Sequence, residues 1–115
     1  MMGKEKTITF HSQWDTEETV SFYKSNYMDN DNVYIGMICC GGEDDGMPYG
    51  DLTVNLIQLE QNLACIDTND CDHNLIAALI DKGLIIPMEY TIPSRFCTYP
   101  VCMLTEEFLN EWCIE

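Results

Sequence analysis

Polar and apolar residues alternate along the first part of the chain with the two-residue period of a β-strand. Residues 7–10 and 19–23 both follow this pattern, and the residues between them, 11–16, are polar. Residues 32–40 continue the alternation over a longer stretch. The pattern therefore predicts an opening β-hairpin followed by a third strand.

A loop rich in glycine and acids follows the third predicted strand. Residues 41–48 contain three glycines, which permit positive φ angles, and three consecutive acids, which are costly to bury. We expect this loop to be exposed. Alternation returns at residues 52–56, and residues 63–67 can form a further short strand.

Apolar residues then recur at the spacing of a helix within residues 72–82. The apolar positions are Leu75, Ile76, Leu79 and Ile80. Residues 68–70 supply side chains that commonly cap a helix, Lys82 falls in the last turn, and Gly83 lies just beyond it. These start and stop signals predict an α-helix over 72–82.

The last third of the chain returns to extended structure and then to a helix. Residues 85–92 are apolar but interrupted by a proline, which favours an edge strand, and residues 96–103 form another strand. Thr105 is placed to cap a final helix that buries an apolar face. That face consists of Phe108, Leu109 and Trp112.

This order of elements predicts an α+β fold in which an antiparallel sheet of about five to six strands packs with two α-helices. No repeat or linker divides the chain, so we expect a single domain over residues 1–115. No stretch approaches the about 18 apolar residues of a membrane span, and the first residues lack the apolar core of a secretion signal. The expected location is cytoplasmic.

The charge is strongly negative and unevenly distributed. The net charge is −15, and no basic residue lies between Lys24 and Lys82, an interval that holds eleven carboxylates. A field of this sign repels DNA, RNA and anionic membranes but attracts a basic protein surface. The alternative is an ordinary solvated acidic surface with no such partner.

Seven cysteines in a chain without a secretion signal indicate reduced thiols, because an odd number cannot all pair. One structural zinc ion, joining the helix start to the late strand, would use four of the residue types that zinc prefers. The candidate ligands are Cys71, His73, Cys97 and Cys102. The pair Cys39–Cys40 is an alternative source of ligands, and small buried thiols without metal are the competing interpretation.

Nothing in the sequence predicts catalysis. The two histidines, His11 and His73, lie in polar positions without a nucleophile in an activating context. Gly41 and Gly42 are followed by acids that repel phosphate. We therefore expect a protein that is not an enzyme.

Four segments together resemble small acidic proteins of unknown function carried by phages and other mobile elements of Gram-positive bacteria. The segments are residues 27–30, 48–56, 66–69 and 96–101. The resemblance carries no catalytic residues, but it implies the genetic setting from which anti-CRISPR and anti-restriction inhibitors are drawn. The chain is richer in cysteine than that family, at Cys39 and Cys102.

Charge and resemblance together predict an anti-CRISPR inhibitor that binds a type II CRISPR RNA-guided nuclease and blocks target-DNA loading, because such nucleases hold nucleic acid in basic channels. The acids expected to contact the partner, displayed together on loops and strand ends, are Asp29, Asp31, Glu43, Asp44, Asp45 and Asp51. The alternatives are a DNA-mimic anti-restriction protein, a small metal-dependent hydrolase or nuclease, and a plain regulatory or structural domain.

Overall fold

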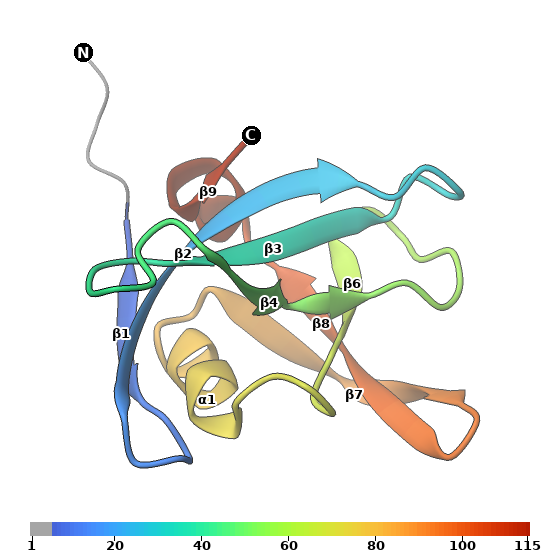
Figure 1. The fold of residues 1–115 in the computed structure, drawn as a ribbon. Coiled ribbons are helices and arrows are strands. Elements are labelled where there is room, and N and C mark those ends of the chain that lie inside the picture. Colours follow the sequence, from blue (N-terminus) through green and yellow to red (C-terminus); the bar gives the residue numbers. More distant parts are fainter. Residues whose placement is uncertain (1–5) are drawn as a thin grey trace.

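Two β-sheets and one α-helix make up the fold of residues 6–115, which the computed structural model describes (Figure 1). The first sheet has the order β1-β2-β3-β4, with β9 also paired to β2, and the second has the order β5-β6-β8-β7. The elements are β1 (Ile8–His11), β2 (Glu17–Asn26), β3 (Val33–Cys39), β4 (Pro48–Asp51), β5 (Thr53–Val54), β6 (Leu63–Ile66), α1 (His73–Asp81), β7 (Ile85–Ser94), β8 (Cys97–Leu104), the π-helical η1 (Phe108–Trp112) and β9 (Cys113–Ile114).

The opening hairpin and the third strand are confirmed. β1 and β3 both pair antiparallel with β2, with Ile8 opposite Val20 and Phe22 opposite Met37. These four side chains are fully buried, which is what the alternating pattern requires of its apolar face. The later strands β6, β7 and β8 also lie where the pattern predicts them, with β7 at the edge of its sheet.

The prediction of a single sheet is wrong, because the chain crosses between two sheets at Leu52. β4 pairs with β3, whereas β5, immediately after Leu52, pairs with β6. The backbone N–H of Leu52 still donates to the carbonyl of Ile35, 2.9 Å away, and the Leu52 side chain is fully buried. Alternation over 52–56 indicates extended backbone but does not reveal which neighbouring strand each half will join.

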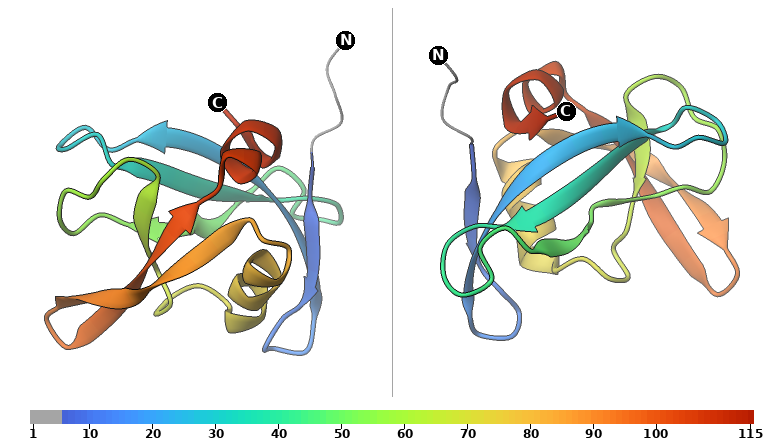
Figure 2. Two further views of the ribbon diagram at one scale, coloured as in Figure 1. Left: turned by 180° about the vertical axis from the view of Figure 1, so that it is seen from behind. Right: turned by 45° about the horizontal axis from the view of Figure 1, so that its top comes forward.

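The helix α1 lies between the two sheets, beside the edge strand β1 of the first sheet and the edge strand β7 of the second (Figures 1 and 2). Its buried residues are Leu75 and Leu79. Gly83, at φ +73°, ends the helix, and the N–H of Leu84 donates to the carbonyl of Leu79. The predicted helix is confirmed, but its cap is Asp72 rather than residues 68–70.

The second predicted α-helix is instead a five-residue π-helix, η1. Thr105 caps it as expected, since its Oγ1 accepts from the N–H of Phe108 at 3.2 Å. Phe108 is fully buried and packs edge-on against Phe22, with ring centres 5.2 Å apart. The wider helical turn ends with the N–H of Cys113 bonded to the carbonyl of Phe108, and β9 then pairs parallel with β2. Among the described residues, 6–115, no helix is long and apolar enough to cross a membrane.

Candidate functional site

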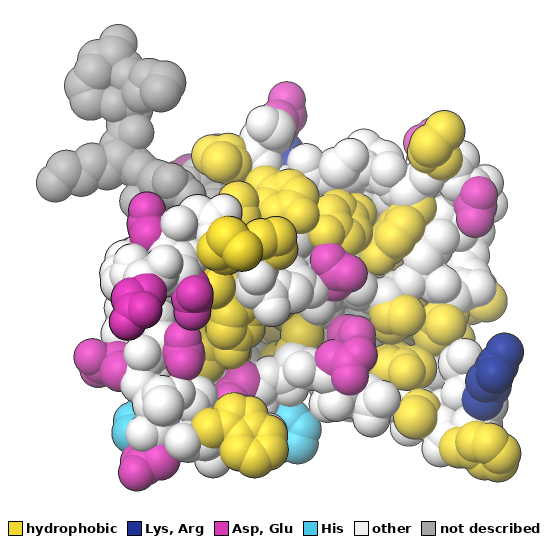
Figure 3. Space-filling view, viewed as in Figure 1, with side chains coloured by type: hydrophobic (Ala, Val, Ile, Leu, Met, Phe, Trp, Pro, Cys, Tyr) yellow, Lys and Arg dark blue, Asp and Glu magenta, His cyan; other side chains and the backbone are white. Residues whose placement is uncertain are grey.

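The most distinctive surface of the molecule is an acidic face built around β4. We define it by the acids at the start of β2, in the β3–β4 loop, at the end of β4 and in the segment before α1. They are Glu17, Glu18, Glu43, Asp44, Asp45, Asp51, Asp67, Asp70 and Asp72. In Figure 3, acidic side chains gather on the side where Figure 1 shows the β1–β2 turn and the β3–β4 loop, while a cationic side chain stands at the opposite edge.

Two groups near β4 show that the ends of this face share one electrostatic environment. Burial raises the pKa of Tyr49, and the carboxylates of Asp72 and Glu18 raise it further. Burial likewise raises the pKa of the Cys39 thiol, with added contributions from Asp44 and Glu18. Because Glu18 acts on both groups, the acids of β2, the loop and the α1 segment produce one continuous negative potential.

A third group extends this environment toward β6. Burial raises the pKa of Cys71 to about 12, and Asp67, Asp70, Asp51 and Asp72 all contribute to the rise. Burial is also the main reason why the pKa of the Asp67 carboxyl is raised, with Asp70 and Asp51 adding to it. The raised pKa of Asp67 therefore reflects burial first and the neighbouring acids second.

Backbone hydrogen bonds close the β3–β4 loop into a frame that displays two of these acids. The N–H of Cys39 donates to the carbonyl of Met47, and the N–H of Gly46 donates to the carbonyl of Cys39, both at 2.8 Å. Asp45 belongs to this frame, because its carboxylate accepts from the N–H of Gly41. Glu43 and Asp44 make no such bond within the described structure and line a hollow of about 430 Å³, which Glu17 and Glu18 line from β2.

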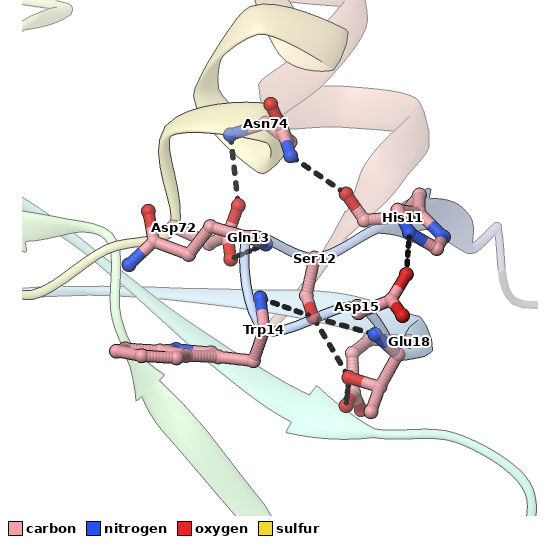
Figure 4. Close-up of polar contacts among 9 residues, drawn as sticks. His11, Ser12, Gln13, Trp14, Asp15, Glu18, Asp72 and Asn74 are labelled. Atoms are coloured by element: carbon pink, nitrogen blue, oxygen red, sulfur yellow. Dashed lines mark hydrogen bonds and ion pairs between the residues drawn. The ribbon is translucent and has the colours of Figure 1, made fainter.

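The opposite end of the face is the junction between the β1–β2 turn and α1 (Figure 4). The two carboxylate oxygens of Asp72 accept from the N–H of Gln13 and of Asn74, each at 2.8 Å. The Asn74 side chain donates to the carbonyl of His11, also at 2.8 Å. Asp72 is therefore a structural acid, buried except for 6% of its surface.

This junction holds the indole of Trp14 out in solvent, 77% exposed. The backbone N–H of Trp14 donates to the Ser12 hydroxyl, and this hydrogen bond fixes the backbone of the turn (Figure 4). Trp14 lies at the rim of a second hollow of about 430 Å³, which is also lined by Tyr49, Asp70 and His73. An aromatic side chain beside free carboxylates is suited to contact cationic side chains of a partner.

The structure does not bring the six predicted contact acids together. Glu43, Asp44 and Asp45 lie at one end of β3, and Asp29 and Asp31 lie in the turn at its other end. Seven strand residues separate the two groups, which is about 23 Å at 3.3 Å per residue. Asp51 lies between them at the end of β4, where it accepts a hydrogen bond from the Tyr34 hydroxyl. The expectation of one shared cluster is corrected, because successive antiparallel connections fall at opposite ends of a strand.

Sequence reasoning missed four exposed or half-buried acids of this face, namely Glu17, Glu18, Asp67 and Asp70. The pairing of Val20 with Cys39 brings the start of β2 beside the β3–β4 loop. The alternating pattern fixes which face of each strand is buried but not the exact register, so the sequence alone did not place Glu17 and Glu18 beside the loop.

The four predicted zinc ligands are not gathered into one group within the described residues. The Cys71 thiol donates to the carbonyl of Asp51 at 3.1 Å, and the exposed His73 ring lies 3.3 Å from the carbonyl of Thr68. Cys97 begins β8, and Cys102 is buried further along the same strand, where burial raises its pKa to about 11. Across residues 6–115, no three His, Cys, Asp or Glu side chains are grouped so as to hold a metal ion.

Two described lysines, Lys6 and Lys24, form ion pairs outside the acidic face. Lys6 pairs with Glu111 at 3.1 Å, and Lys24 pairs with Glu115 at 3.7 Å, so both lysines neutralise acids of the C-terminal segment. In the part of the chain that the structure describes, no lysine or arginine forms an ion pair with an acid of the acidic face. The negative potential of that face is therefore available to a partner.

Fold and surface together define a small two-sheet α+β domain with an acidic face whose acids form no ion pair with a lysine or arginine among residues 6–115. The chain belongs to a family described as a domain of unknown function, DUF4313, which matches residues 21–115. The β1 strand and the turn that carries Trp14 precede the matched region. No curated protein and no solved structure gives a significant match.

Proposed function

We propose that this protein is a non-enzymatic inhibitor that binds a basic, nucleic-acid-handling protein through the acidic face. The observation that carries the proposal is the continuity of that face: its acids act jointly on Tyr49, Cys39 and Cys71, and no described lysine or arginine neutralises them. A partner with a positive groove would associate faster and more selectively for this reason.

The size of the domain fits such a groove. Its longest dimensions are 36 × 36 Å, about the length of ten base pairs of duplex at 3.4 Å per base pair. Ten base pairs carry about 20 phosphates, whereas the acidic face carries nine acids, of which Asp45 and Asp72 serve the backbone. The domain therefore matches the length of a short duplex, and its acidic face carries the same sign of charge at lower density.

The partner that we propose is a type II CRISPR RNA-guided nuclease, in line with the resemblance to mobile-element proteins. Such a nuclease holds its guide–target duplex in a positively charged channel. The acidic face would occupy that channel, or the basic surface beside it, and prevent target DNA from loading. Inhibition then requires one bound inhibitor per nuclease and no chemical step.

The test uses a purified type II effector loaded with guide RNA, and it measures binding of labelled target DNA as the protein is added. We expect inhibition to be complete near a 1:1 ratio. We also expect the affinity of the protein for the effector to fall at least about tenfold between low and physiological salt, because exposed charges are screened over about 8 Å at 0.15 M.

Two matched variants, each lacking two charges, locate the interface. Glu43→Gln with Asp44→Asn removes free acids of the acidic face and should weaken binding by about tenfold. Asp29→Asn with Asp31→Asn removes the same charge at the far end of β3 and should change the affinity by less than about twofold. Asparagine suits position 31, whose φ is +62°.

Three results would contradict the proposal. Inhibition well below a 1:1 ratio, with altered guide RNA or nuclease, would indicate an enzyme. Equal losses from the two double variants would mean that net charge acts without a defined face. Absence of binding to the effector, together with binding to a DNA-cleaving restriction enzyme, would favour the DNA-mimic alternative.

A further inference from the structure

The β7–β8 hairpin projects from the second sheet as an arm (Figures 1 and 2), and several of its apolar side chains are exposed. The Phe96 side chain at its tip is fully exposed, at 103% of its reference area. Ile86, Met88 and Tyr90 on β7 are each about 40% exposed. These four are a large share of the ten exposed large hydrophobic residues among the described residues, so the arm is an apolar patch of the kind that marks an interaction surface.

The arm is also the electrically neutral part of a strongly acidic protein. Residues 85–104 contain one acid, Glu89, and one base, Arg95, and therefore carry no net charge. Both are exposed, and neither forms an ion pair within the described residues. Six positions separate these two unpaired, opposite charges along the same strand and turn.

The free edge of β7 is protected against addition of another strand. Pro87 and Pro93 lack the N–H groups that such pairing needs, and the ladder with β8 shifts register between Pro87 and Thr91. Glu89, at φ +68°, lies within this irregularity. A partner must therefore contact the faces and tip of the arm rather than extend its sheet.

We propose that the β7–β8 hairpin is a self-association surface, where two copies of this chain pack their arms against each other about a twofold axis. In this arrangement the arms run antiparallel, so the part of β7 that carries Glu89 in one copy lies beside the turn that carries Arg95 in the other. A twofold interface requires a patch that complements itself in this way. The inference does not depend on the proposed inhibitory function.

A second copy fits this patch better than another occupant because of charge and area. Two chains of net charge −15 repel one another over most of their surfaces, and the arm is where that repulsion is absent. An interface of standard size covers about 800 Å² of each partner, which is about a ninth of the 7299 Å² surface. The 20 residues of the hairpin are about a sixth of the chain.

The test is sedimentation equilibrium of the full chain over a range of concentrations, with variants of matched exposure. We expect a reversible dimer in the micromolar range. Phe96→Asp should weaken dimerisation by about a hundredfold, because each dimer loses two buried phenyl rings. Met28→Asp serves as the control, since Met28 is 99% exposed in the distant β2–β3 turn, and it should leave the dimerisation constant unchanged.

Charge exchange then tests the twofold arrangement. Glu89→Arg alone and Arg95→Glu alone should each weaken the dimer, and the two substitutions together should restore it, because the facing pairs are re-formed with reversed sign. Raising the salt concentration from about 0.01 to 0.15 M should strengthen the dimer by screening the net repulsion.

Each contrary result overturns the proposal. A chain that stays monomeric at about 0.5 mM and 0.15 M salt, well above the range of micromolar association, has no self-association surface. A dimer unaffected by Phe96→Asp forms through another surface. If the double charge variant fails to recover, the antiparallel pairing of the arms is wrong.

Discussion

The acidic face and the β7–β8 arm lie on the same small domain but differ in how they can recognise a partner. The acidic face acts through a field that reaches several ångströms into solvent and weakens with salt. The neutral arm acts only on contact, by removing apolar surface from water, and association through it should strengthen with salt, because salt screens the repulsion between the two acidic chains. The opposite salt responses expected for the two surfaces allow their roles to be separated in one protein.

The comparison also shows that membership of the acidic face does not by itself leave a carboxylate free. Asp72 and Asp45 belong to the acidic face, yet their carboxylates are occupied by backbone N–H groups. Glu43, Asp44 and Asp70 leave their carboxylates free for a partner. On the arm, by contrast, neither charge has a structural partner among the described residues, so both are free to act at an interface.

The largest effect on stability should come from replacing Asp72, which joins the β1–β2 turn to α1 by hydrogen bonds. Asp72→Ala removes a helix cap and a charge-assisted hydrogen bond to the β1–β2 turn, so we expect the free energy of unfolding to fall by about 2–4 kcal/mol. Asp70→Ala, which removes a neighbouring exposed acid, should change it by less than about 0.5 kcal/mol. Urea denaturation measures both. Equal losses would mean that Asp72 is no more structural than its neighbour.

Salt should stabilise the folded chain, because self-repulsion of the acidic face opposes compaction. We expect the free energy of unfolding in urea to rise by on the order of 1 kcal/mol between about 0.01 and 0.15 M monovalent salt. The increase should be smaller in the variant Glu43→Gln with Asp44→Asn and unchanged in Phe96→Ser. A salt response that is equal in all three proteins would show that the acidic face is not the source of the repulsion.

Much of the strand and helix content could be predicted from the sequence because it is governed by local periodicity. The pairs Ile8–Val20 and Phe22–Met37 follow directly from the alternation, and α1 follows from its helical spacing and Gly83. The crossing between sheets at Leu52 could not be predicted, since both halves of the segment have the same extended pattern. The π-helix η1 is followed directly by the pairing of β9 with β2, and local periodicity holds no signal for that pairing.

The sequence predicts an acidic surface but does not show which acids share it. The interval without basic residues predicts an acidic surface, and within residues 6–115 Lys6 and Lys24 pair with acids outside the acidic face. The sequence order could not reveal that Asp29 and Asp31 lie a strand length away from Glu43, because contiguity along the chain differs from contiguity on a folded surface. The arm was missed since its residues read only as an edge strand.

Replacing Asp67 should produce a smaller, pH-dependent effect. The folded-state pKa of Asp67 is raised above its value of about 3.9 in the unfolded chain, so the folded state binds the proton more tightly. Stability from this group is therefore lost as the pH rises from about 3.9 through the folded-state pKa. Asp67→Asn should raise the free energy of unfolding at pH 7 by up to about 1 kcal/mol and flatten the pH dependence in that window.

The Asp67 measurement is a set of urea denaturation curves across that pH range. Asp29→Asn, which removes an acid from the turn at the far end of β3, is the control and should leave the slope unchanged. A steeper slope in Asp67→Asn than in the parent chain would reverse the sign of the argument, because it would mean that the folded state favours the ionised form.

The smallest effect on stability should come from the arm, and this sharpens the contrast between the two surfaces. Phe96 is fully exposed and Met88 and Tyr90 are about 40% exposed, so Phe96→Ser removes no buried apolar area from the single chain. We expect the free energy of unfolding of the monomer to change by less than about 0.5 kcal/mol, measured in urea at a concentration well below the dimerisation constant. At high concentration the parent chain should become more stable than Phe96→Ser, because dimerisation stabilises the folded state by mass action. A large destabilisation of the dilute variant would mean that Phe96 supports the fold. Phe96 would then have a structural role, as Asp72 has in the acidic face.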